Sequence, residues 1–221
     1  VGSEMCIRDR LNTLTTQIEP HDCIAELSHS IIRINNILID MNRDIWMYIS
    51  NDLFKLKVIK GEVGSSTMPH KVNPIDFENS EGNLELSNAL FTFFGDKLSK
   101  SRLQRDLSDS TVLRNIGVPF GHSYLAIQSL IKGFSKLEVN KEQSLKELNN
   151  NWQILGEAIQ TVMKLEGYDD AYEIIKDLTR GELLTENSYK SLINSLDISI
   201  KSKSKLLKLT PATYIGLSKS I

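Results

Sequence analysis

Apolar residues recur along much of the chain at alternating spacings of three and four, which is the period of an α-helix. The longest such series is formed by Ile24, Leu27, Ile31, Ile34, Leu38, Met41, Ile45 and Tyr48. A seam sustained over more than three heptads predicts a long helix that packs against several helical neighbours. Pro20 and Asp22 suit its first turn, where proline loses no hydrogen bond and the helix dipole favours a carboxylate.

Two further long helices are predicted before residue 140. One runs from Asp76, which we expect as its N-cap, to about Leu98. The other opens at Ser110 and continues to Phe134 with the same spacing, and we expect it to kink at Pro119. Three long periodic segments without strand patterns predict an all-α fold.

The character of the sequence changes near residue 140, where a polar stretch is followed by shorter periodic segments. We expect helices over 152–165, 171–178 and 186–196. Residues 140–221 are therefore predicted to form a separate small helical domain, and residues 11–139 the long-helix domain. The smaller domain carries no residue pattern that marks it as catalytic.

The 221 residues carry a formal net charge of −2. This balance argues against a general nucleic-acid or membrane surface, so an anionic ligand must be held by a few placed Lys and Arg side chains. No apolar run is long enough to span a bilayer. Cys6 and Cys23 provide neither a disulfide framework nor a metal cluster, which suits a reducing cytoplasm. We interpret His21, His29 and His122 as capping, surface or packing residues.

The stretch from Gly64 to Pro74, Gly-Ser-Ser-Thr-Met-Pro-His-Lys-Val-Asn-Pro, interrupts the helical pattern between the first two long helices. Consecutive amides of a Gly/Ser turn can bind an anion, and Lys71 adds a positive charge. Such a site could stabilise the charge left when a C–H beside a carboxylate loses its proton, with Ser65 or Ser66 as the base. The alternative is a polar surface loop whose serines bond to their own backbone.

A second candidate site begins the third predicted helix. Ser110 is suited to the N-cap, and free amides at a helix start attract phosphate. Arg114 lies one turn further on the same face, and Arg105 lies in the polar linker before the helix. The planar guanidinium group matches the geometry of phosphate. The alternative is a capped helix with solvated arginines.

Residues 64–74 resemble the signature loop of the fumarase/aspartase superfamily, whose members release fumarate from a substituted succinate. Three flanking segments, 17–22, 76–83 and 101–115, are similar to those of its adenylosuccinate lyase branch, in the bacterial form that carries His70 where others carry an aromatic. The resemblance runs from about residue 11 to the carboxyl end. We therefore expect residues 1–10 to be extraneous, with a genuine but divergent helix start as the alternative.

The resemblance implies a stepwise β-elimination with Ser65 as the general base and residues 61–75 as the signature loop. It also implies that Arg105, Ser110 and Arg114 hold a nucleotide phosphate. A general-acid histidine is expected in a part of the enzyme that precedes this chain, so the chain by itself is expected to be inactive. The substrate-binding positions that the resemblance implies are Gln17, Ser66, Lys71, Val72, Asn73, Asn79, Arg105, Ser110, Thr111, Val112, Leu113 and Arg114.

By the same resemblance, the chain is expected to be the carboxy-terminal half of a cytoplasmic homotetrameric enzyme. That enzyme would split adenylosuccinate into AMP and fumarate, and would act likewise on the succinylated aminoimidazole carboxamide ribotide. The resemblance implies no metal or organic cofactor and no nucleic-acid or membrane partner. Two alternatives stay open. A sibling lyase for argininosuccinate, aspartate or malate would need no phosphate site, and a non-catalytic helical assembly module would need no site at all.

Overall fold

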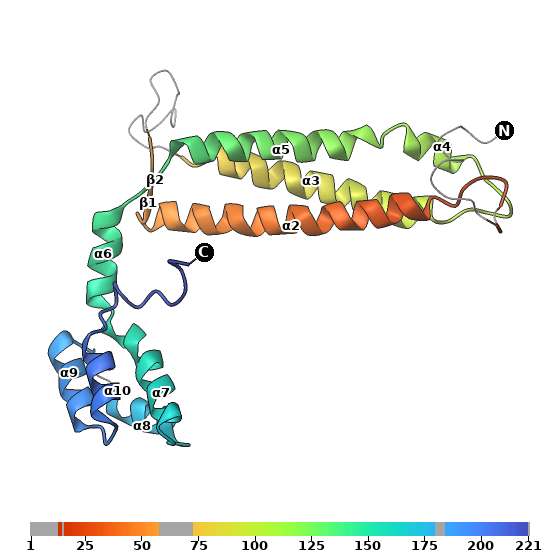
Figure 1. Ribbon diagram of the computed structural model, residues 1–221. Coiled ribbons are helices and arrows are strands. Elements are labelled where there is room, and N and C mark those ends of the chain that lie inside the picture. The colour runs from red at the N-terminus through yellow and green to blue at the C-terminus, as the bar shows by residue number, and fades with distance from the viewer. Residues whose placement is uncertain (1–12, 15, 58–72, 180–183, 221) are drawn as a thin grey trace. The chain divides into compact units, whose positions relative to one another are not determined.

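The structure is a computed structural model that describes residues 13, 14, 16–57, 73–179 and 184–220. The chain divides into two compact units, Val1–Val139 and Asn140–Ile221. Both units are helical, and the described residues contain a single sheet of two short strands. The prediction of an all-α fold is confirmed (Figure 1).

The first unit is a bundle of three long helices that lie side by side (Figure 1). These are α2 (Asp22–Ser50), α3 (Ile75–Leu98) and α5 (Gly117–Lys136). Its shorter elements are α4 (Ser108–Leu113), β1 (Phe54–Leu56) and β2 (Leu137–Val139). The two strands pair antiparallel, with Phe54 opposite Val139. This ribbon joins the chain that leaves α2 to the chain that leaves α5.

Apolar side chains between the three helices form the core of the first unit. Phe77 packs with Ile45 and Leu130 near the ribbon, and is 1% exposed. Gly133 allows this close packing, because a Cβ atom at its position would lie 2.8 Å from the ring of Phe77. The other buried apolar residues of the unit are Ala25, Ile39, Leu84, Phe91, Phe94, Leu98 and Ala126.

Polar side chains occupy the most deeply buried line of α2. Ser28, Asn35 and Asn42 recur at heptad spacing, and each is at most 2% exposed. Leu27 and Ile34, which belong to the predicted apolar seam, are 50% and 57% exposed. The row of residues that α2 buries within this chain is therefore shifted by one position from the predicted apolar seam. The prediction missed this row because it considered apolar residues only, and the row contains serine and asparagine.

The layer around Asn35 is well hydrogen-bonded. Asn35 Nδ2 donates to Asn88 Oδ1 at 3.0 Å and to Ser123 Oγ at 3.1 Å. The hydroxyls of Ser123 and Ser87 lie 2.8 Å apart, and Ser87 donates to the carbonyl oxygen of Pro119 at 2.9 Å. This layer links all three long helices through polar contacts.

The layer around Asn42 is simpler. Asn42 Nδ2 donates to Ser80 Oγ at 3.0 Å, and Ser80 is fully buried. Asn42 Oδ1 is buried without a hydrogen-bond partner in the described part of the chain. A buried carbonyl oxygen without a donor costs free energy, so this layer is the weaker of the two.

Neither Asp76 nor Ser110 is the N-cap that the sequence predicts. The first residue of α3 precedes Asp76, whose carboxylate lies in the first turn and binds Lys136 Nζ. Helix α4 begins two residues before Ser110. The carboxylate of Asp106 accepts a hydrogen bond from the amide of Ser108 at 2.9 Å, which satisfies the first amide of this helix.

The third predicted helix is divided into two helices, α4 and α5. The predicted kink at Pro119 assumed one continuous helix, and that assumption is wrong. Helix α5 begins at Gly117, so Pro119 lies in its first turn. A residue at this position needs no amide hydrogen for the helix, and proline is tolerated there without a kink.

The second unit contains five α-helices and one turn of 3₁₀ helix within its described residues. They are α6 (Lys141–Asn150), η1 (Trp152–Leu155), α7 (Gly156–Leu165), α8 (Ala171–Thr179), α9 (Glu186–Ser195) and α10 (Ile200–Leu207). The predictions of helices over 152–165, 171–178 and 186–196 are confirmed. Helices α6 and α10 were not predicted, since their sequences are polar and rich in Lys, Ser and Asn.

The core of the second unit forms around Tyr189. Its ring is fully buried, and its hydroxyl donates to the carbonyl oxygen of Leu206 at 2.8 Å. Burial raises the pKa of Tyr189 to about 12. Outside this core, Glu166 Oε1 accepts hydrogen bonds from the hydroxyls of Ser199 and Ser202, both at 2.6 Å, and so attaches the start of α10 to the end of α7.

Candidate active site

Four of the predicted site residues, Ser65, Ser66, Lys71 and Val72, lie outside the described residues. Their roles stay predictions. Asn73 is the first described residue after them, and it is half-buried directly before Pro74 and helix α3.

The chain on each side of residues 58–72 is attached to the same lysine. The carbonyl oxygen of Lys136 accepts the amide of Lys57 at 2.8 Å. The ammonium group of Lys136 donates to Asp76 Oδ2 at 2.7 Å, and Lys132 Nζ lies 3.4 Å from the other oxygen of that carboxylate. The Lys136 side chain is only 8% exposed. The ends of the segment that carries the candidate base are thereby fixed to the end of α5.

Asn79 lies about one turn after Asp76 in α3, on the exposed surface of that helix. Ser129 Oγ donates to Asn79 Oδ1 at 3.0 Å, and Asn83 Nδ2 lies 3.0 Å from the same oxygen. Asn83 Oδ1 in turn lies 2.8 Å from His122 Nδ1. The sequence singled out Asn79 alone. The i, i+4 spacing of Asn79 and Asn83 was a usable signal, whereas nothing local identified Ser129 or His122, which lie on α5.

The other predicted residues lie at the far end of the bundle. Two basic side chains approach the carboxylate of Asp109 there, with His21 Nε2 at 3.6 Å and Arg105 Nε at 3.9 Å from its Oδ2. Helix α2 begins at Asp22, with His21 directly before it at a left-handed φ of 60°. Pro20 therefore lies outside the helix, whereas the sequence predicts it in the first turn. The amide of His21 donates to Glu19 Oε2 at 2.6 Å. These contacts join the segment that carries Gln17 to α4.

Helix α4 holds Ser110, Thr111, Val112 and Leu113, and Arg114 follows directly after it. The amide of Ser110 donates to Asp109 Oδ1 at 2.8 Å. The guanidinium groups of Arg105 and Arg114 make no hydrogen bond to any described residue. Arg105 Nε is buried, whereas Arg114 is exposed and can offer its N–H groups to an anion. Asp109 stands beside Arg105 and would have to share it with a bound phosphate.

Asp106 stabilises the loop that leads into α4. Hydrogen bonds from Ser108, and after them one from Arg102, hold the pKa of Asp106 well below its usual range. A carboxylate that stays charged in this place keeps the turn formed at neutral pH.

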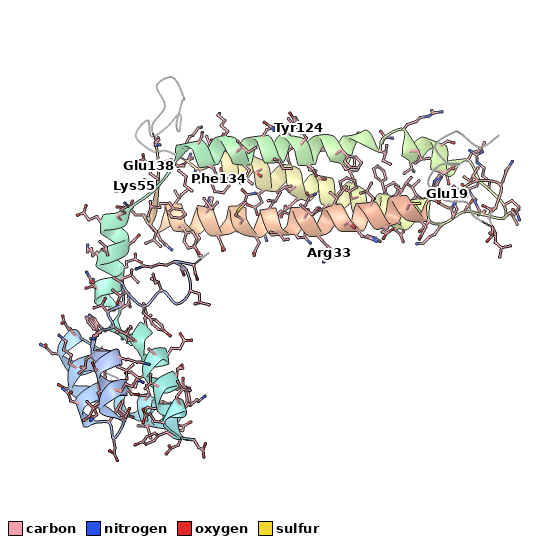
Figure 2. The ribbon with its side chains drawn as sticks, viewed as in Figure 1. Glu19, Arg33, Lys55, Tyr124, Phe134 and Glu138 are labelled. Atoms are coloured by element: carbon pink, nitrogen blue, oxygen red, sulfur yellow. The ribbon has the colours of Figure 1, made fainter. Side chains whose placement is uncertain are left out.

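The structure therefore separates the predicted residues into two groups. Asn73 and Asn79 lie at the amino end of α3, whereas α4 and the segments that carry Gln17 and Arg105 lie beyond its carboxyl end (Figure 1). Leu98 lies nineteen positions after Asn79 in the same helix, which corresponds to about 28 Å along the axis. In Figure 2, Lys55 and Glu138 mark the first end of the bundle and Glu19 marks the second. One chain does not bring the two groups together.

The described residues contain neither a cluster of metal ligands nor a membrane-spanning helix. No set of three or more His, Cys, Asp or Glu side chains is placed to hold a metal ion. None of the helices there combines the length and the hydropathy that a membrane-spanning segment requires.

Comparison with solved structures places the fold. The chain superimposes on a class II fumarase from Schistosoma mansoni with a TM-score of 0.62 and 20% identity, covering 85% of this chain and 39% of the fumarase. The 3-carboxy-cis,cis-muconate lactonizing enzyme from Pseudomonas putida gives a TM-score of 0.64 at 20% identity, covering 89% of this chain and 46% of that enzyme.

Comparison with curated proteins gives much closer relatives. An adenylosuccinate lyase from Legionella pneumophila (strain Corby) is 58% identical over 207 residues, which are 94% of this chain and 45% of that protein. The adenylosuccinate lyase of Escherichia coli (strain K12) is 56% identical over 205 residues, or 93% and 45% of the two chains. The chain thus spans a little under half the length of the curated relatives it matches.

Two family descriptions match the sequence. The one described as "Lyase" covers residues 7–86, and the one described as "Adenylosuccinate lyase C-terminal" covers residues 101–215, which is more than half of the chain. Both descriptions agree with the helical fold and with the relatives. The chain belongs to the adenylosuccinate lyase family.

Proposed function

We propose that the protein to which this chain contributes eliminates fumarate from adenylosuccinate, giving AMP, and from the succinylated aminoimidazole carboxamide ribotide. The observation that carries this proposal is family membership together with the guanidinium groups of Arg105 and Arg114 on either side of α4, neither of which makes a hydrogen bond to a described residue. A lyase for argininosuccinate, aspartate or malate has no phosphate to bind, so such a pair favours a nucleotide substrate.

In the proposed reaction Ser65 removes the proton beside a succinyl carboxylate. The electron pair is delocalised into that carboxylate, and the carbon–nitrogen bond then breaks to release fumarate. The departing nitrogen takes a proton from a general acid that this chain does not supply. Ser66, Lys71 and Asn73 stabilise the intermediate charge, while Gln17 and Asn79 hold the substrate.

The proposed site draws on more than one copy of the chain. The two groups of candidate residues are about 28 Å apart along α3, which exceeds the length of a succinylated nucleotide. Large apolar side chains on the bundle surface also lack cover, among them Ile37 at 70%, Tyr124 at 62% and Ile131 at 57% exposure. An exposed set of this kind favours contacts with other chains. We propose a homotetramer in the cytoplasm.

A chimaeric enzyme tests the proposal. This chain would replace the matching part of the Escherichia coli relative, and cleavage of adenylosuccinate would be followed by absorbance. Ser65→Ala should abolish turnover and leave AMP binding within about twofold, because it removes the base and no phosphate contact. Ser66→Ala should retain part of the activity. Turnover by Ser65→Ala with loss in Ser66→Ala would exchange the two roles.

The phosphate site has its own test in the same chimaera. Arg114→Lys keeps the charge and loses the planar fork, so AMP should bind about tenfold more weakly, as expected for one charge-assisted hydrogen bond. Fumarate binding should not change. If Arg114→Lys weakened fumarate and left AMP unchanged by calorimetry, the nucleotide specificity would lose its support.

A further inference from the structure

The hydrogen bonds around Asn79 limit how this residue can bind a ligand. We propose that Asn79 acts only as a hydrogen-bond donor, through Nδ2, and that His122 is a positioning residue that fixes this polarity through Asn83. The inference rests on the proposed function in one respect, namely that Asn79 contacts the substrate.

The orientation of Asn83 follows from its contact with a backbone group. Its Nδ2 lies 2.9 Å from the carbonyl oxygen of Asn79, which can only accept a hydrogen bond. The amide nitrogen of Asn83 must therefore face Asn79, and its Oδ1 must face His122. This assignment needs no choice between the two amide rotamers, because the reversed rotamer would set two oxygen atoms against each other.

The tautomer of His122 follows in turn. Its Nδ1 lies 2.8 Å from Asn83 Oδ1, which has no hydrogen to donate. His122 must then carry a proton on Nδ1, and the neutral ring has none on Nε2. The half-buried ring belongs to α5, so it holds Asn83 from outside the helix that carries both asparagines.

These two assignments determine which hydrogen bonds the side chain of Asn79 can still make. Its Oδ1 accepts from Asn83 Nδ2 at 3.0 Å and from Ser129 Oγ at 3.0 Å, and these two donors fill its two lone pairs. Its Nδ2 has no partner among the described residues, and the side chain is exposed. Asn79 therefore offers a ligand two N–H groups and no free acceptor. It would recognise an acceptor oxygen, such as that of a succinyl carboxylate, and reject a donor.

The tautomer is measured on the 221-residue chain by long-range ¹H–¹⁵N correlation of the imidazole nitrogens. We expect the Nδ1–H form for His122 at a pH where the ring is neutral. Asn83→Leu, which removes the acceptor, should allow the Nε2–H form to appear. An Nε2–H tautomer in the unmodified chain would overturn the proposal. This result does not depend on activity, so it separates the hydrogen-bond relay from the proposed reaction.

The functional consequence is measured in the chimaera described above. Asn79→Asp keeps an acceptor for both Asn83 and Ser129 but removes the outward donor. We expect an unchanged melting temperature and at least a tenfold rise in KM for adenylosuccinate. Asn150→Asp adds the same charge on an exposed face of the second unit and should leave KM unchanged. Equal or tighter substrate binding by Asn79→Asp would overturn the donor assignment.

His122 is tested by a pair of variants in the same chimaera. His122→Asn places an amide N–H where Nδ1–H stood, so KM should stay within about twofold. His122→Phe keeps the ring and removes the donor, and KM should rise about three- to tenfold with little change in kcat. Equal values for the two variants would overturn the positioning role. A chimaera that cleaves no adenylosuccinate would contradict the proposed reaction and leave the tautomer result standing.

Discussion

The ammonium group of Lys136 donates to Asp76 Oδ2 at 2.7 Å in a nearly buried ion pair, in which the two side chains are 8% and 17% exposed. This contact joins the last turn of α5 to the first turn of α3. Because the backbone of Lys136 also receives the amide of Lys57, one residue fixes the chain on both sides of the signature segment.

Lys136→Met should lower the free energy of unfolding of the first unit by roughly 1.5–3 kcal/mol, the usual contribution of a hydrogen bond to a charged group. The physical reason is that the carboxylate of Asp76 is left partly buried without its closest cation. Lys132→Met is the matched control: the Lys132 side chain is 57% exposed, and we expect a loss of about 0–1 kcal/mol. Urea unfolding followed by hydrogen exchange in α3 and α5 measures both. Equal losses would contradict the assignment.

Two glycines of the bundle should respond to alanine with opposite signs. At Gly133 the new Cβ would lie 2.8–3.1 Å from three ring atoms of the buried Phe77, and overpacking of this kind costs about 1–3 kcal/mol. At Gly95 it would meet the end of the exposed His29 side chain, which can rotate away. Gly95→Ala should then gain up to about 1 kcal/mol from helix propensity. Thermal unfolding of the two variants compares them directly, and stabilisation by both would show that the Phe77 ring adapts without cost.

The two polar layers of the bundle should also differ. Asn35→Leu removes an amide that bonds to Asn88 and Ser123, so we expect a loss of about 1–3 kcal/mol from the groups left unpaired. The double variant Asn42→Leu/Ser80→Ala removes both partners of one hydrogen bond and an oxygen that has no donor among the described residues. It should be neutral or stabilising. The free energies of unfolding of the two variants are compared by urea unfolding. A larger loss for the double variant than for Asn35→Leu would contradict the hydrogen-bond assignment.

Glu166 should make the second unit sensitive to acid. Hydrogen bonds from Ser199 and then Ser202 lower its pKa from the ordinary value of 4.5. Because the folded-state pKa is the lower one, the carboxylate contributes stability above pH 4.5, and this contribution is lost as the pH falls through the folded-state pKa. Glu166→Gln should therefore reduce the melting temperature at pH 7, with a difference that shrinks in acid.

Fluorescence of Trp152, with Trp46 replaced by Phe, reports this melting, since Trp152 packs against Tyr189 in the core of the second unit. Glu173→Gln is the control, because Glu173 is 61% exposed and pairs only with Lys176 among the described residues. A pH-independent difference for Glu166→Gln would show that the carboxylate does not act through its charge.

Periodicity alone predicted the helical class, because apolar spacing depends only on neighbours along the chain. It could not predict the shift of the buried line of α2 from Ile34 to Asn35, since that depends on Ser87 and Ser123, more than fifty residues away. The N-cap prediction for Asp76 was wrong for a related reason. A carboxylate at a helix start is a good cap only when no cation from another helix binds it first.

The candidate site follows the same division. The resemblance selected Asn79 and Arg105, but local sequence could not place them at opposite ends of one bundle. That arrangement depends on the length of α3 and on the antiparallel return of the chain through α5 (Figure 1). The partners of these residues, Ser129 and Asp109, were missed because a serine or aspartate has no recognisable pattern when its role is to orient another side chain.

The hydrogen-bonded layer around Asn35 also fixes a length. A slip of one helix past another by a single heptad would move its end by about 10 Å, and would separate Asn35 from Asn88 and Ser123. The distance from Asn79 to the arginine end of the bundle is therefore set inside each chain, before any copy meets another. In the oligomer proposed above, the distance between the two groups of candidate residues would therefore be the same in every copy.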